Sequence, residues 1–184
     1  GLLASPMFNT MYADRDGNIY YAYYGAIPRR DMQFDWSKPV DGNNPATDWQ
    51  GYHPLSELPT LTNPDAGYLQ NCNATPFLAT CGDSNLNPQD YPAYMVSEAD
   101  NNRSRRSRIL LSGERNMSWK TLQSITWDTQ VAEADRLLPV LFQEVAARGL
   151  TGDRGAAVNR AVQQLKRWDR IATVRSEATT VSHR

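Results

Sequence analysis

The prolines are distributed so unevenly that they divide the chain in two. Ten of the eleven lie between Pro6 and Pro92, and only Pro139 follows them in a chain of 184 residues. Proline lacks a backbone N–H and clashes with the preceding helical turn, so it is disfavoured inside helices and central strands. The distribution therefore predicts an α+β chain in which residues 1–100 are rich in strands and loops and residues 101–184 form a helical segment.

The first strands are expected within residues 7–24. Two aromatic, β-prone runs, 7–13 and 18–24, flank the sequence Asp14-Arg15-Asp16-Gly17. Asp-Gly between such runs predicts a β-hairpin, because Gly17 accepts a positive φ. Both faces of the second run are apolar or aromatic, which is typical of a strand covered on both sides.

The next segments are less regular. Residues 26–66 contain six prolines and no clear periodicity, as in ordered surface loops or loops that shape a site. Residues 67–73 predict one more short strand. In a strand, Asn71 and Asn73 would point to the same face, where two amides need hydrogen-bond partners or a polar cavity.

Helices are expected from residue 101 onward. A short helix is predicted over residues 103–111, ended by Gly113, and Ser118 is expected to cap a longer one. The apolar residues of that longer helix recur at helical spacing: Leu122, Ile125, Val131 and Ala134.

The helical pattern then continues from Leu137 to a stop at Gly149, and Pro139 either starts a new helix or kinks this one. A last amphipathic helix is predicted over residues 156–168, and the polar tail after Ile171 is expected to fray.

Charge excludes several classes of function. The chain has 19 Lys+Arg and 20 Asp+Glu, a formal net charge of −1, so it lacks a general attraction to nucleic acid or an anionic membrane. The arginines of residues 103–108 have no interleaved aromatics, which favours a solvated or carboxylate-paired surface. No apolar run approaches the roughly 20 residues of a membrane-spanning helix. We therefore expect neither a nucleic-acid partner nor membrane insertion.

Few residues fit a catalytic or metal-binding pattern. His53 lies in a proline-rich loop and His183 in the tail, so neither is expected to be a ligand or a base. Cys72 and Cys81 cannot form a zinc site alone, and no metal site is predicted. Their spacing allows a disulfide in an oxidising compartment or two thiols otherwise, and both alternatives stay open.

An ordered series of short motifs is more specific than any single one. The first half contains Asp14-x-x-Gly17-Asn18, Gly25-x-Ile27-Pro28-x-Arg30, Pro39-Val40-Asp41-Gly42, Trp49-x-Gly51, Leu58-Pro59, Asn63-Pro64-x-x-Gly67 and Asn71-x-Asn73. The second half contains Arg103-x-x-Arg106, Trp119, Thr126-Trp127-Asp128, Ala134-Asp135-x-Leu137-Leu138-Pro139 and Trp168-Asp169. In this order and spacing they resemble the β-chain of the penicillin acylases, which are N-terminal-nucleophile hydrolases, over essentially the whole chain.

The resemblance implies a fold and a reaction. The fold is part of an αββα four-layer sandwich with a helical extension, and residues 1–184 are one piece of a larger β-chain. The reaction is amide hydrolysis by a free N-terminal Ser whose own α-amino group acts as the base. A backbone N–H and an Asn side chain hold the oxyanion; Asn73 matches that Asn, and Arg103 matches an arginine that supports the site electrostatically.

The nucleophile is expected on another chain. This chain begins with Gly1 and Leu2 rather than with Ser, so the resemblance implies partners from the same processed precursor: an α-chain and a nucleophile-bearing β segment. Residues 1–184 alone are expected to be inert.

Within the family, Tyr23–Arg30 and Gln70–Phe77 look most like acylases that act on aliphatic chains. These are the quorum-quenching N-acyl-homoserine lactone acylases and the aculeacin and penicillin V acylases. The resemblance thus implies an N-acylated small molecule as substrate, an acyl-homoserine lactone ahead of a penicillin or lipopeptide, and a periplasmic or secreted location. A non-catalytic scaffold relative is the remaining alternative.

The resemblance implies no cofactor. Calcium-binding relatives carry a carboxylate after an Asp-Tyr-Pro-Ala motif, whereas here Asp90-Tyr91-Pro92-Ala93 is followed by Tyr94 and Met95. A structural calcium ion is therefore not expected.

Overall fold

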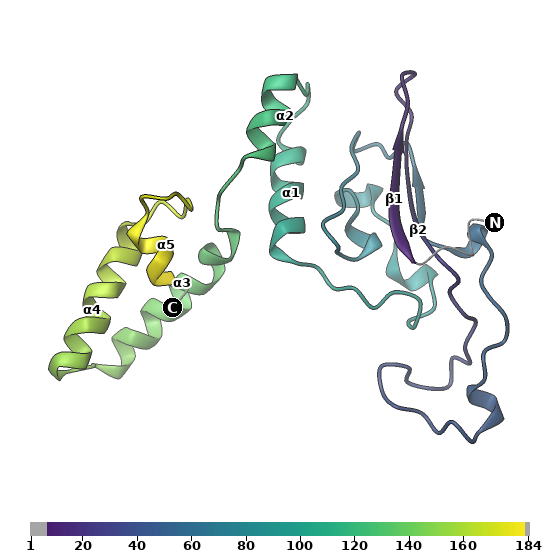
Figure 1. The fold of residues 1–184 in the computed structure, drawn as a ribbon, viewed down its shortest axis with the longest axis horizontal. Helices are drawn as coiled ribbons and strands as arrows, with labels where there is room; N and C mark the ends of the chain where they lie inside the picture. The colour runs from purple at the N-terminus through teal and green to yellow at the C-terminus, as the bar shows by residue number, and fades with distance from the viewer. Residues whose placement is uncertain (1–6, 183–184) are drawn as a thin grey trace. The chain divides into compact units, whose positions relative to one another are not determined.

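The computed structural model describes residues 7–182. They form two compact units that meet in the chain between Glu114 and Arg115. The first unit contains a small antiparallel sheet, short 3-10 helices and one α-helix, and the second contains four α-helices (Figure 1). This mixture of helices and a small sheet agrees with the predicted α+β class.

The sheet of the first unit has three antiparallel strands in the order β1-β2-β3. These are β1 (Phe8–Ala13), β2 (Ile19–Tyr24) and β3 (Thr60–Thr62). The predicted hairpin is confirmed: β1 pairs with β2 from Phe8 opposite Tyr24 to Ala13 opposite Ile19. β2 is the central strand, and its Tyr21, Ala22 and Tyr23 are buried.

The hairpin turn is built around one carboxylate. Asp14 Oδ1 accepts the backbone N–H groups of Asp16 and Asn18, each at 2.9 Å, and Asp14 Oδ2 accepts the side-chain amide of Asn18. Gly17 has a φ of +89°, a backbone conformation open to glycine without strain. The motif Asp14-x-x-Gly17-Asn18 is therefore explained by the turn itself.

The third strand shows how the proline-rich loop is anchored. Its three residues pair with β2 between two prolines, and the Asn63 side chain that follows accepts the Ile19 N–H at 2.8 Å. Sequence periodicity misses such a short strand, because three residues are too few to display an alternation.

The core of the first unit lies against β2. It consists of buried Tyr21, Tyr23, Ile27, Leu58, Ala79 and Met95. The Tyr23 hydroxyl donates to Glu98 Oε2 at 2.8 Å, so the polar end of a fully buried ring is satisfied.

His53 belongs to the structure of the loop. It is 4% exposed; its Nδ1 lies 2.7 Å from Glu57 Oε2 and its Nε2 lies 3.0 Å from the Tyr94 hydroxyl. Glu57 also pairs with Arg29 at 2.7 Å. His53 thus links three segments of the loop-rich region, whereas His183 lies outside the described residues.

The strand predicted over residues 67–73 is wrong. The Gln70 N–H does bond outward, to the Ala79 carbonyl at 2.7 Å, but the Asn71 side chain accepts the Asn73 N–H at 3.0 Å and closes a turn. Asn73 then has a left-handed φ of +55°. Short polar side chains commonly offer such local alternatives to sheet hydrogen bonds.

Short 3-10 helices and one α-helix complete the first unit. The 3-10 helices span Pro45–Thr47, Leu55–Glu57, Pro76–Leu78, Gly82–Ser84 and Pro88–Asp90. The α-helix α1 spans Asn102–Ser112, begins at an Asn101 cap and ends at Gly113. The predicted short helix and its stop are therefore confirmed.

The second unit contains four helices, and the expected long helix from Ser118 is broken. Ser118 caps α2 (Trp119–Thr126), and α3 (Ala132–Arg148) starts only after Val131. The intervening backbone pairs elsewhere: Val131 N–H bonds to Arg170 O at 2.8 Å, and Ala172 N–H to Thr129 O at 2.9 Å. These bonds to a distant segment replace the helical ones.

The later helix boundaries agree with most stop signals. Helix α3 runs through Pro139, so no new helix starts there, and Gly149 ends it with a φ of +53°. Helix α4 spans Gly152–Arg167, a start four residues earlier than predicted. The tail expected to fray contains α5 (Glu177–Ser182).

The second unit has its own apolar core, made of Ala134, Leu138, Leu165, Trp168 and Ala178. No helix within residues 7–182 combines the length and the apolar character needed to cross a bilayer.

Candidate functional site

The candidate site is the loop around Asn73, which the side chain of Asn71 holds in its turn. Asn71 Oδ1 accepts the Asn73 N–H at 3.0 Å, and Asn71 Nδ2 donates to the Ala74 carbonyl at 3.3 Å. Asn73 is exposed at the tip, whereas Ala74, Thr75 and Pro76 directly after it are buried. The loop therefore exposes the Asn73 side-chain amide to solvent, while the residues directly after it are fixed in the interior.

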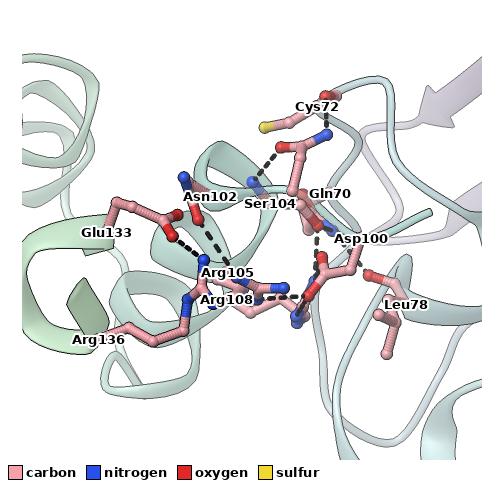
Figure 2. Close-up of polar contacts among 11 residues, drawn as sticks. Gln70, Cys72, Leu78, Asp100, Asn102, Ser104, Arg105, Arg108, Glu133 and Arg136 are labelled. Atoms are coloured by element: carbon pink, nitrogen blue, oxygen red, sulfur yellow. Dashed lines mark hydrogen bonds and ion pairs between the residues drawn. The ribbon is translucent and has the colours of Figure 1, made fainter. Parts of the chain in front are cut away.

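The anchor is the start of α1. Asn101 Nδ2 donates to the carbonyls of Cys72 at 3.0 Å and Asn73 at 3.3 Å. Its Oδ1 accepts the Ser104 N–H at 3.0 Å, as expected of a helix cap. Figure 2 shows Cys72 and Ser104 on the two sides of this connection.

The two residues predicted for the site lie in contact. Arg103 Nη2 donates to Asn73 Oδ1 at 3.2 Å, across 30 residues of sequence. Among the residues that the structure describes, none accepts a hydrogen bond from Asn73 Nδ2. Because its oxygen already accepts from the guanidinium, the Asn73 side chain has its NH₂ group available to an outside acceptor.

A polar cluster, called the hub here, is formed by Gln70, Ser104, Asp100 and Arg108. Ser104 is fully buried, and its Oγ accepts Gln70 Nε2 at 3.0 Å and Arg108 Nη1 at 2.6 Å. Gln70 Nε2 also donates to the Leu78 carbonyl at 2.7 Å. As Figure 2 shows, the Gln70 side chain thus links Ser104 of α1 to Leu78, which follows the site loop.

Asp100 completes the hub with a double ion pair. Its two carboxylate oxygens accept from Arg108 at 3.1 and 3.0 Å, and Arg105 Nε donates to Asp100 Oδ2 at 2.9 Å. Partial burial acts to raise the pKa of Asp100, but the hydrogen bonds and charge of Arg108 outweigh it and hold that pKa below its ordinary value. The carboxylate pairing favoured for the arginine cluster is therefore seen at Arg105 and Arg108.

The two cysteines are thiols in the structure. The Cys81 thiol has the hydroxyls of Tyr68 and Ser112 as hydrogen-bond partners, and these lower its pKa. The structure shows both residues as thiols, and the choice between the two alternatives open from the sequence depends on the redox state of the compartment.

No metal-binding cluster of three or more His, Cys, Asp or Glu side chains occurs within residues 7–182. Tyr94, which follows the Asp90-Tyr91-Pro92-Ala93 motif, contacts His53 and accepts the Arg30 N–H at 3.1 Å.

Sequence reasoning missed Asn101 and Ser104. Asn101 has a detectable signal, because an asparagine directly before a helix is a common cap. Its bonds to the Cys72 and Asn73 carbonyls, and the burial of Ser104, depend on packing that no local pattern encodes.

Comparison with known proteins places the chain in a family. The family model described as penicillin amidase matches residues 2–184. The chain belongs to the penicillin amidase family. The resemblance seen in the ordered motifs is thus confirmed.

Two relatives illustrate the family. Penicillin G acylase of Escherichia coli is 28% identical over 183 residues, which cover 94% of this chain and 19% of that protein. A solved structure of a thermostable penicillin G acylase from Alcaligenes faecalis matches with a TM-score of 0.62 at 20% identity, covering 93% of this chain and 29% of the other. The chain therefore shares its fold with penicillin acylases and spans about a fifth of the length of the curated relative.

Proposed function

We propose that this chain is the part of an N-acyl amide hydrolase that supplies the side-chain donor of the oxyanion hole. Asn73 is that donor, and Arg103 supports it. The observation that carries the proposal is the bond from Arg103 Nη2 to Asn73 Oδ1, which leaves the Asn73 NH₂ group free at an exposed loop tip.

The pair suits the chemistry of amide hydrolysis. Attack on an acyl carbonyl places negative charge on its oxygen, and a preorganised N–H donor stabilises that charge most when its orientation is fixed beforehand. The guanidinium of Arg103 polarises the Asn73 amide from its oxygen side and adds positive charge near the developing oxyanion. The loop and the helix cap fix the amide, so little reorganisation accompanies the reaction.

The remaining machinery is proposed to lie on other chains. By resemblance, the nucleophile is an N-terminal Ser of a separate β segment, produced by autoprocessing of a common precursor, and its α-amino group, with a reference pKa of about 8, is the base. Residues 1–100 would supply strands and loops to the four-layer sandwich, and residues 101–184 its helical extension. The proposed location is periplasmic or secreted.

The proposed substrate is an N-acylated small molecule. The sequences Tyr23–Arg30 and Gln70–Phe77 support an acyl-homoserine lactone, and hence quorum quenching. A penicillin is the second candidate, favoured because both relatives described above are penicillin G acylases.

Replacing Asn73 with glycine in the assembled enzyme tests the proposal. Glycine accepts the left-handed backbone of this position without strain, so the variant removes only the amide. We expect kcat on acyl-homoserine lactones and penicillins to fall about 100- to 1000-fold, or roughly 3–4 kcal/mol, as for loss of one oxyanion donor. Wild-type turnover by a correctly processed Asn73→Gly enzyme would refute the assignment.

A further inference from the structure

One side chain connects both partners of the candidate site. The Asn101 amide accepts the Ser104 N–H through its oxygen and donates to the Cys72 and Asn73 carbonyls through its nitrogen. An asparagine that only caps a helix uses its oxygen alone. The nitrogen of Asn101 therefore has a separate partner set, which lies in the loop that carries Asn73.

The loop depends on such bonds because it has no sheet partner at its tip. Asn73 lies in the left-handed region, with φ of +55°, a conformation that the surroundings of a non-glycine residue must maintain. Asn71 holds the N–H side of Asn73, Asn101 holds its C=O side, and Thr75 N–H bonds to the Ala99 carbonyl at 3.3 Å. The peptide units flanking the Asn73 Cα are thus held from both directions.

The position of Arg103 on α1 also depends on Asn101. Arg103 is the second residue of α1, and Asn101 caps that helix. The first turn of a helix lacks internal partners for its N–H groups, so its cap defines where the turn starts. Asn101 thus sets the backbone that carries Arg103 as well as the backbone that carries Asn73.

We infer that Asn101 is a positioning residue of the amide hydrolase: its amide sets the relative geometry of Arg103 and Asn73, and through it the direction of the Asn73 N–H groups. This inference rests on the proposed function. Asn101 acts through Asn73 and does not itself touch the substrate.

Two substitutions in the assembled enzyme separate its capping from its positioning. Asn101→Ser and Asn101→Asp both keep an oxygen for the Ser104 N–H, since Ser and Asp are good caps, and both lose the Nδ2 donor. We expect kcat to fall roughly 10- to 100-fold in each, the range typical of a misplaced catalytic group, with KM changed less than about twofold because uniform binding is intact. The apparent melting temperature should remain close to that of the wild type.

The matched control is Asn44→Asp. Asn44 caps a 3-10 helix by accepting the Ala46 N–H at 3.1 Å, so the same chemical change there keeps the cap and should leave kcat unchanged. If Asn101→Asp loses activity but the neutral Asn101→Ser does not, the effect is one of charge and the inference is overturned.

A double-mutant cycle tests the route through Asn73. In the Asn73→Gly background, Asn101→Ser should lower the residual kcat by less than about twofold, because the group that it positions is gone. Full additivity would overturn the inference. The two proposals fail separately: an active Asn73→Gly enzyme refutes the oxyanion assignment, whereas an inactive Asn73→Gly with a fully active Asn101→Ser refutes only the role of Asn101.

Discussion

Replacing Ser104 with alanine should loosen the connection between the site loop and α1. Ser104 is fully buried, and its Oγ accepts one neutral bond from Gln70 and one charged bond from Arg108. Each donor keeps a second partner, the Leu78 carbonyl for Gln70 and Asp100 for Arg108. The loss is therefore smaller than for two orphaned donors.

The size of the effect follows from these contacts. A neutral hydrogen bond contributes about 0.5–1.5 kcal/mol and one to a charged group about 1.5–3 kcal/mol. With the second partners kept, and with alanine gaining a few tenths of a kcal/mol in helix propensity, we expect the opening free energy of this region to fall by about 2 kcal/mol. At about 1.4 kcal/mol per factor of ten, this corresponds to roughly 30-fold faster exchange of protected α1 amides.

Hydrogen exchange of the assembled enzyme, read by mass spectrometry on peptides from Asn102–Ser112, measures this change. Ser107→Ala is the matched control, since Ser107 lies on the same helix, gains the same propensity and is half-buried. If the α1 amides exchange equally fast in Ser104→Ala and Ser107→Ala, the Ser104 hydrogen bonds do not stabilise this region and the reasoning is refuted.

Two further predictions concern stability. The folded-state pKa of Asp100 is depressed, so its pairing stabilises the protein above its unfolded pKa of about 3.9, and that contribution is lost as the pH falls through the lower folded value. The melting temperatures of wild type and Asp100→Asn should therefore differ at neutral pH and converge in acid. A difference that is constant with pH would contradict this. Helix-interior Gly→Ala changes usually stabilise by up to about 1 kcal/mol. At Gly155, however, a Cβ would meet the Leu150 carbonyl at 2.6 Å, so Gly155→Ala should lower the melting temperature. Gly42→Ala, where the space is open, should not.

Local features of the fold could be predicted from the sequence because their causes are local. The hairpin depends on Asp14 and Gly17 within one turn, and the end of α1 depends on Gly113 directly after it. The gap between α2 and α3 could not be predicted, because Val131 finds its partner at Arg170, far away in the sequence.

The resemblance gave two candidate residues, Asn73 and Arg103, but the sequence did not predict the geometry around them. The structure brings these two side chains to 3.2 Å. The turn closed by Asn71 overrode the strand expected there. Asn101 and Ser104 each also bond to a segment about 30 residues away in sequence, and only packing brings these segments together.

The most direct test of the oxyanion assignment is a crystal structure of the assembled enzyme carrying a phosphonate analogue of the tetrahedral intermediate. We predict that Asn73 Nδ2 lies about 2.7–3.1 Å from the phosphoryl oxygen that replaces the oxyanion, with Arg103 still bonded to Asn73 Oδ1. A phosphoryl oxygen held entirely by other donors, with Asn73 turned away from it, would contradict the assignment.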